Sequence, residues 1–197
     1  MNKLISIKRY HKYYIQTAIQ KILEVFYKHP EREFSLSDLA KEAGVAKANI
    51  GAIINDLASK DFIKVEKLTK IWRIKANQAD WYFQKSKIVY NLNFIYQSGL
   101  VEFLYEQYNH PKAIIIFGSF RKGEDISNSD IDIAIEHEEF KEYKIIYLRE
   151  LIKFEKEIGR KIQIHEFKRS LIDKSLFNNI TNGIVLIGFL EVNHESR

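Results

Sequence analysis

No cysteine occurs in the chain, so a disulfide framework and a thiolate metal site are both excluded. The chain also lacks any apolar run that approaches the length of a membrane span. The first residues, Met1 to Tyr14, do not have the long apolar core of a signal peptide. We therefore expect a cytoplasmic protein without a membrane partner.

Several common functional motifs are missing as well. The sequence has neither a glycine-rich Walker loop nor the glycine fingerprint of dinucleotide-binding folds, which removes the commonest nucleotide-binding folds. Internal repeats, low-complexity tracts and a flexible Gly/Ser-rich linker are also absent. The histidines that are scattered without metal-ligand spacing, and so predict no zinc site, are His11, His29, His110, His137 and His194.

The composition is that of a globular protein, with 46% hydrophobic and 29% charged residues. The length of 197 residues is enough for two small domains. The net charge of +5 is unevenly distributed, because residues 1–80 carry 15 Lys+Arg against 9 Asp+Glu and residues 81–197 carry 16 against 17. The basic first part makes nucleic acid a candidate partner for that part.

The first part of the chain has the periodicity of three helices. Apolar residues at 15–26 fall at helical spacing, and the pattern stops before Pro30. Ser37 can cap a second, short helix, and Gly44 suits the turn after it. Apolar positions within residues 50–57 give a third helix its buried side.

Two alternating segments follow at residues 62–68 and 71–76 and predict a two-stranded hairpin. A helix, a helix-turn-helix and then a two-stranded wing resemble a winged helix domain. In that family the second helix of the pair usually enters the DNA major groove. The residues that the resemblance makes candidates for nucleic-acid binding are Lys47, Asn49, Asn55, Lys64, Lys67 and Lys70.

The helix that would read DNA is poorly supplied with base-reading side chains. Gly51 and Ala52 stand where many relatives have Ser, Arg or His, and Ala46 replaces the usual capping Ser or Thr. The lysines of the wing suit phosphate contacts rather than sequence reading. A docking or dimerising role for this domain therefore stays open beside DNA or RNA binding.

Residues 78–110 are rich in aromatic side chains at helical spacing. Gly99 interrupts the pattern, so we expect two helices rather than one. Aromatic side chains can stack on nucleobases, but this spacing favours a core role. We expect a helical connector that packs on the second domain.

The most informative stretch begins with an Ile-rich run at residues 113–117, which predicts a buried strand that ends at Gly118-Ser119. After a polar loop, the segment from Asp130 alternates strictly and predicts a half-buried strand. Its period places Asp130 and Asp132 on one face, close enough to share a divalent cation. If the two strands are neighbours, the Gly-Ser turn offers N–H groups and a hydroxyl to phosphate at the same place.

Gly118-Ser119, ten intervening residues and Asp130-Ile131-Asp132 resemble the signature of the nucleotidyltransferase superfamily that includes DNA polymerase β, in its minimal form. In such enzymes the Gly-Ser turn holds the nucleoside triphosphate and the aspartates hold Mg²⁺. The residues next to the turn that could add a phosphate contact are Arg121 and Lys122.

Polymerase β-like enzymes generally use a third carboxylate, one strand further on. The equivalent strand, residues 161–167, has Gln163 and His165 at the positions that face the site. Three explanations stay open. Glu166 reaches the site through a bulge or at the strand end, His165 serves as the general base, or the domain binds a metal–nucleotide complex and does little chemistry.

In the rest of the chain, residues 138–159 predict a charged amphipathic helix. A further helix is expected to start at Ser170 and a last strand at residues 184–187. The fold class is α/β (α+β), with a winged helix-turn-helix domain followed by a mixed-sheet polymerase β-like domain. The expected divisions are a winged helix domain at 1–77, a helical connector at 78–110 and a minimal nucleotidyltransferase domain at 111–197.

The sequence thus favours a nucleotidyltransferase that transfers a nucleoside monophosphate from a nucleoside triphosphate to an acceptor. Asp130 and Asp132 would hold Mg²⁺ or Mn²⁺ and form the catalytic set with His165. The alternative is a DNA-binding transcriptional regulator, or an antitoxin-like partner protein, with a nucleotide-binding but catalytically weak second domain. The nucleobase, the acceptor (RNA, a protein side chain or a small molecule), a protein partner and a homodimer stay open.

Overall fold

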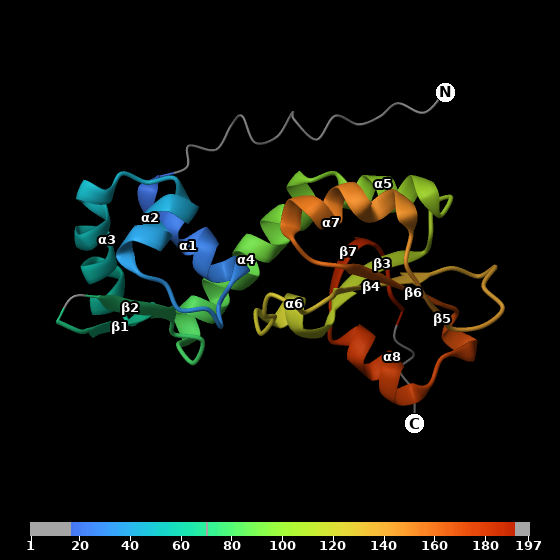
Figure 1. Cartoon of the computed structure of the whole chain (residues 1–197). Helices are drawn as coiled ribbons and strands as arrows, with labels where there is room; N and C mark the ends of the chain where they lie inside the picture. The colour runs from blue at the N-terminus through green and yellow to red at the C-terminus, as the bar shows by residue number, and fades with distance from the viewer. Residues whose placement is uncertain (1–16, 70, 192–197) are drawn as a thin grey trace.

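The structure is a computed structural model that describes residues 17–69 and 71–191. Two lobes lie side by side, and helix α4 (Trp81–Gln97) runs from one into the other (Figure 1). We call residues 17–76 the N-terminal lobe and residues 100–191 the C-terminal lobe. No helix in the described ranges is long and apolar enough to cross a membrane.

The described part of the N-terminal lobe has the helices and the hairpin that the sequence predicts. Their bounds are α1 (Ala18–Lys28), α2 (Leu36–Ala43), α3 (Lys47–Ser59), β1 (Ile63–Lys67) and β2 (Trp72–Ala76). The predicted cap of α2 at Ser37 is wrong, because the extended Ser35 precedes the helix and its side chain accepts the Asp38 N–H. Gly44 ends this helix with a φ of 62°, as predicted.

The apolar sides of these elements meet in one core. Ile22 of α1, Leu39 of α2 and Ile54 of α3 are completely buried there. The hairpin closes the core with Ile74, and Phe34 forms an isolated bridge to Ile74. The three helices therefore hold the hairpin at a fixed position beside α3.

Helix α4 belongs to both lobes. Phe83 in its first turn packs into the N-terminal core, and Ile95 near its end packs into the main core of the C-terminal lobe. Gly99 has a φ of 76° and separates α4 from α5 (Leu100–Gln107), so the predicted break at Gly99 is confirmed. The helical connector is thus shared between the two cores.

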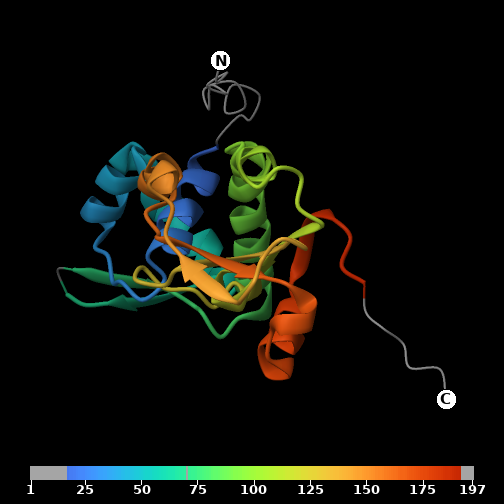
Figure 2. The same cartoon turned by 90° about the vertical axis from the view of Figure 1, so that its right-hand side faces the viewer.

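In the described residues the C-terminal lobe is built on a five-stranded mixed sheet of order β5-β6-β4-β3-β7. Strands β4 and β6 are parallel, and the other neighbours are antiparallel. Helices α5 and α7 lie on one face of the sheet and α8 on the other (Figures 1 and 2). The bounds are β3 (Ala113–Phe117), α6 (Gly118–Lys122), β4 (Ile131–Glu136), β5 (Lys144–Ile146), α7 (Ile152–Ile158), β6 (Ile162–Phe167), α8 (Lys174–Thr181) and β7 (Ile184–Gly188).

Residues 138–159 do not form the single helix that their periodicity predicts. They contain β5, a 3-10 turn at Arg149–Leu151 and only then α7. Strand β5 pairs with β6, with Ile146 opposite Ile164, and so covers an edge of β6 that would otherwise be unpaired. The predicted start of the next helix at Ser170 is also wrong, because the side chain of Asp173 supplies the cap of α8.

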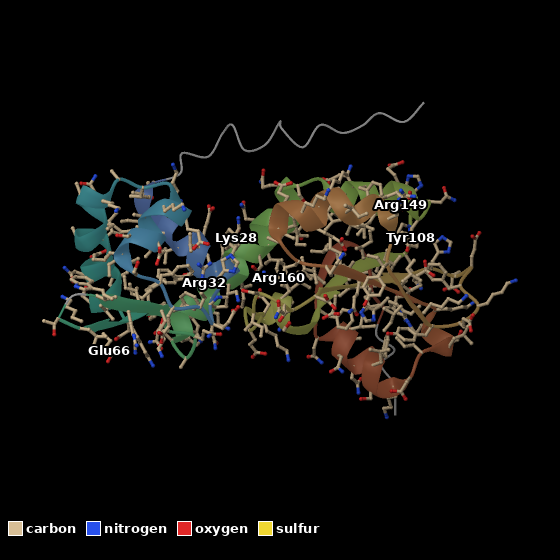
Figure 3. The ribbon with its side chains drawn as sticks, viewed as in Figure 1. Lys28, Arg32, Glu66, Tyr108, Arg149 and Arg160 are labelled. Carbon is tan, nitrogen blue, oxygen red and sulfur yellow. The ribbon has the colours of Figure 1, made fainter. Side chains whose placement is uncertain are left out.

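A buried ionic cluster joins the two lobes. Asp125, in the loop between α6 and β4, lies 3.1 Å from Lys87 Nζ and 3.3 Å from Arg160 Nη2, and it accepts a hydrogen bond from Asn91 at 3.0 Å. Arg160 also donates to the carbonyl oxygen of Lys28 at the end of α1, at 2.8 Å. Figure 3 shows Lys28 and Arg160 where the lobes meet. We call Lys87, Asn91, Asp125 and Arg160 the Asp125 cluster.

Replacing Asp125 by Asn should lower the free energy of unfolding by about 3–5 kcal/mol, because Lys87 and Arg160 would keep their buried charges without a counter-ion. Urea unfolding followed by circular dichroism measures this loss. Glu66→Gln is the matched control, since the Glu66–Arg73 pair is exposed and 3.8 Å long and should contribute less than about 1 kcal/mol. Equal losses in the two variants would contradict a stabilising role of the cluster.

Candidate functional site

The Gly118-Ser119 turn lies at the end of β3, where helix α6 begins. Gly118 has a φ of 73°, a conformation that favours glycine. A Cβ atom at this position would overlap the carboxylate of Asp132. Glycine therefore lets the turn pass close to the acidic residue, and this close approach gives a physical reason for the Gly-Ser pattern.

The two aspartates lie beside this turn. Asp130 directly precedes β4 and Asp132 is the second residue of that strand. Strands β3 and β4 are antiparallel neighbours with Phe117 opposite Asp132, so the predicted proximity of turn and carboxylates is confirmed. The side chain of Asp132 is 24% exposed, which leaves its carboxylate accessible to a ligand.

Strand β6 places a polar partner beside each aspartate. Gln163 lies opposite Asp132 in the parallel register, and its side-chain amide donates to the Asp130 carboxylate. His165 Nε2 lies 3.3 Å from Asp132 Oδ1, and its Nδ1 lies 2.7 Å from the Tyr143 hydroxyl. Each carboxylate is thus oriented by one side chain of the neighbouring strand.

These contacts engage both ring nitrogens of His165. A carboxylate only accepts hydrogen bonds, so in the neutral imidazole Nε2–H donates to Asp132 and Nδ1 accepts from Tyr143. Burial, with a contribution from the Asp132 charge, raises the pKa of the Tyr143 hydroxyl, which keeps it protonated as a donor. The geometry favours an orienting role for His165, because a general base would have to break one of these contacts.

Glu166 faces away from the aspartates. It pairs with Ile135 in an unbroken register, and its carboxylate accepts a hydrogen bond of 2.9 Å from the Tyr108 hydroxyl at the end of α5. The explanation that brings Glu166 to the site through a bulge is therefore wrong, because an unbroken register fixes the face of each side chain. Gln163 and His165 occupy the site-facing positions of the strand on which the resemblance would place a third carboxylate.

The two aspartates suit a metal ion whose coordination is completed by a bound substrate. Within residues 17–69 and 71–191, no group of three or more His, Cys, Asp or Glu side chains is arranged to hold a metal. Mg²⁺, however, is commonly bound by one or two carboxylates together with substrate phosphates and water. Asp130 and Asp132 fit such a shared ion better than an ion held by the protein alone.

Arg121 and Lys122 follow the turn on α6. The Nε atom of Arg121 is buried and has no hydrogen-bond partner in the part of the chain that is described. A buried donor without an acceptor costs free energy. Lys122 is exposed, and both residues stay candidates for a phosphate contact.

The candidates for nucleic-acid binding form a separate group. Lys67 of β1 donates to Asn55 of α3 at 3.2 Å, so the hairpin and α3 bring their polar residues together. Figure 1 places α3 and the hairpin at the outer end of the N-terminal lobe, away from β4 in the C-terminal lobe. Lys70 lies outside the described residues. The members of this group with exposed side chains are Lys47, Asn49, Asn55, Lys64 and Lys67.

The sequence did not reveal Tyr143 as a neighbour of the site. Helical periodicity placed it on the apolar side of a helix, whereas β5 and the segment before it lie along β6. Its contact with His165 depends on this strand pairing, for which residues 138–159 carry no clear local signal. The long-range pairing therefore had to be seen before Tyr143 could be assigned.

Replacing Gln163 by Glu should place a third carboxylate beside Asp130 and Asp132. Without metal the like charges repel one another and the melting temperature should fall by several degrees; Mg²⁺ or Mn²⁺ should restore it. Differential scanning fluorimetry against metal concentration measures both effects. The control Gln107→Glu adds the same charge at an exposed position of α5. A response to metal that is the same in both variants would contradict the site geometry.

The comparison with known proteins places the site within a recognised domain. Residues 98–184 match the family model described as a nucleotidyltransferase domain. No curated protein and no solved structure matched the chain. The matched residues include the Gly118-Ser119 turn, Asp130, Asp132 and the strand of His165, and they exclude the N-terminal lobe. This part of the chain, a mixed sheet with its helices, is therefore similar in sequence to a nucleotidyltransferase domain.

Proposed function

We propose that the chain transfers a nucleoside monophosphate from a nucleoside triphosphate to an acceptor hydroxyl. The observation that carries this proposal is the meeting of the Gly118-Ser119 turn with Asp130 and Asp132 at one end of β4. The family match gives nucleotidyl transfer as the general reaction. Ser119 and the backbone N–H groups after Gly118 would orient the β and γ phosphates, and Arg121 would add a contact.

Asp130 and Asp132 are the residues that would hold Mg²⁺ or Mn²⁺. When bound, the cation would neutralise charge on the α-phosphate and on the departing pyrophosphate. Gln163 and His165 keep the two carboxylates in fixed orientations. Phosphoryl transfer depends mainly on positioning and on charge stabilisation, and these residues supply both.

For the N-terminal lobe we propose a winged helix within residues 1–77, followed by the connector at 78–110 and the catalytic domain at 111–197. The order of three helices and a hairpin supports this reading. The contact between Lys67 and Asn55 supports a shared polar surface of the hairpin and α3 that would contact DNA or RNA phosphates.

A second candidate function is favoured by Gln163. An amide beside Asp130, on a strand that offers the site no third carboxylate, suits a domain that binds a metal–nucleotide complex and reacts slowly. The chain would then be a DNA-binding transcriptional regulator or an antitoxin-like partner protein. In that case turnover is low although nucleotide binding is retained.

Asp132→Asn should abolish stabilisation of the fold by a nucleoside triphosphate with Mg²⁺. For the native chain, a ligand at a hundred times its dissociation constant should add about 2.7 kcal/mol, which raises the melting temperature by several degrees. Metal alone should have little effect, because the triphosphate completes the site. The control Asp56→Asn removes an exposed carboxylate of α3 and should respond like the native chain. A full response in Asp132→Asn would overturn the site assignment.

Lys47→Glu combined with Lys67→Glu should weaken binding of duplex DNA and lower the salt dependence of binding. The slope of log K against log salt concentration should change by about 1 for each phosphate that the variant no longer neutralises. Fluorescence anisotropy at several salt concentrations measures both quantities. Lys156→Glu with Lys174→Glu makes the same charge change at exposed positions of the C-terminal lobe. Equal binding by the two double variants would contradict a nucleic-acid surface on α3 and the hairpin.

A further inference from the structure

A pocket of ≈ 420 Å³ opens beside Asp130. Its volume lies within the range of about 300–1,000 Å³ that is usual for small-molecule sites. Besides Asp130, the walls come from the segment after β5, from α7 and from the residue before β6. These wall residues are Tyr147, Leu148, Arg149, Ile152, Glu155 and Lys161. We call this cavity the Asp130 pocket.

The walls combine exposed apolar groups with an exposed cation. Tyr147 is 61% exposed and Ile152 is 41% exposed, although both are large apolar side chains. Arg149 is exposed and pairs with no carboxylate among the described residues. Figure 3 shows Arg149 on the outside of the C-terminal lobe. An exposed aromatic ring beside an accessible guanidinium suits a ligand that has both a planar ring and an anionic group.

The acidic wall residue Glu155 is already engaged. Its Oε1 accepts the backbone N–H of Ile162 at 3.0 Å, and its Oε2 lies 3.4 Å from Lys161 Nζ. Glu155 therefore offsets Lys161 and leaves the charge of Arg149 available. Asp130, one of the two residues proposed to hold the metal, also lines the pocket.

The strand order separates this pocket from the triphosphate side. The Gly118-Ser119 turn ends β3, which lies on one side of β4, whereas Lys161 precedes β6 on the other side. Asp130 lies between the two and belongs to both. A group bound in the pocket would therefore lie beside one of the two carboxylates proposed to hold the metal, on the other side of β4 from the turn.

We infer that the Asp130 pocket receives the acceptor, and that the acceptor is a nucleotide with a free hydroxyl, either free in solution or at the end of a single strand. This inference rests on the proposed nucleotidyl transfer and names its second substrate. The base stacks on Tyr147 and a phosphate meets Arg149. The acceptor oxygen forms a bond to the α-phosphorus, the bond between the α- and β-phosphates breaks, pyrophosphate leaves, and the hydroxyl proton passes to water at the open pocket.

The test measures binding of three probes to the full chain: adenosine 5′-monophosphate, a diadenylate and a ten-residue oligoadenylate. Tyr147→Ala should lower the affinity for the probe by about 5- to 150-fold, the range for loss of one base–aromatic stack. Arg149→Ala should lower the affinity for the probe and reduce the salt dependence of probe binding. Tyr82→Ala, which removes a ring that is 65% exposed on α4, is the matched control and should bind normally. Equal binding of monophosphate and oligomer supports a free nucleotide, and preference for the oligomer supports a strand end.

The same variants separate this inference from the proposed function. Tyr147→Ala and Arg149→Ala should keep the stabilisation by nucleoside triphosphate with Mg²⁺ that Asp132→Asn loses. If they keep that stabilisation and also bind the probes like the native chain, the pocket assignment is overturned while the proposed function stands. If Tyr147→Ala lost the stabilisation by nucleoside triphosphate with Mg²⁺, the pocket would hold the base of the triphosphate instead, and its assignment to the acceptor would be overturned. The assignment would also be overturned if the native chain bound none of the probes, or if it transferred the nucleoside monophosphate only to a protein.

Discussion

The buried carboxylate of Asp125 is the interaction on which the arrangement of the molecule depends. It holds Lys87 and Asn91 of α4 and Arg160 after α7, and Arg160 in turn holds the end of α1. Burial lowers the pKa of Lys87, and the Asp125 charge opposes this effect. Because an unpaired charge in this place would be costly, three distant parts of the chain have to meet here for any of them to be satisfied. The loop that leads to Asp130 is thereby tied to both lobes.

The polar groups of the site each have fewer partners within the protein than they can accommodate. Asp130 and Asp132 have one orienting partner each on β6, and the turn at Gly118 passes directly beside the Asp132 carboxylate. Arg121 carries a buried donor without an acceptor in the described part of the chain. A triphosphate with its cation would satisfy the carboxylates and the turn together. Nucleotide and metal are therefore expected to bind as a unit, with affinity that neither has alone.

Much of the site could be predicted from the sequence because its signals are local. Strict alternation put Asp130 and Asp132 on one face, and the same rule correctly kept Glu166 off that face. The errors arose where long-range contacts decide. Residues 138–159 have helical periodicity, yet the open edge of β6 takes part of them as β5. Asp125 reads as an ordinary loop charge, since its partners lie 34 to 38 positions away in the sequence.

Gln163 has a consequence for how this site could change over time. Glutamine and glutamate codons differ by a single base, so a third carboxylate at this position is within reach of one mutation. No genetic barrier holds the amide in place. The hydrogen bond from Gln163 to Asp130 favours the amide only while the site has no bound metal, when the fold needs the aspartate to have a partner. A cell that kept this protein permanently loaded with nucleotide and cation would remove that constraint, whereas one that left it empty for long periods would preserve it.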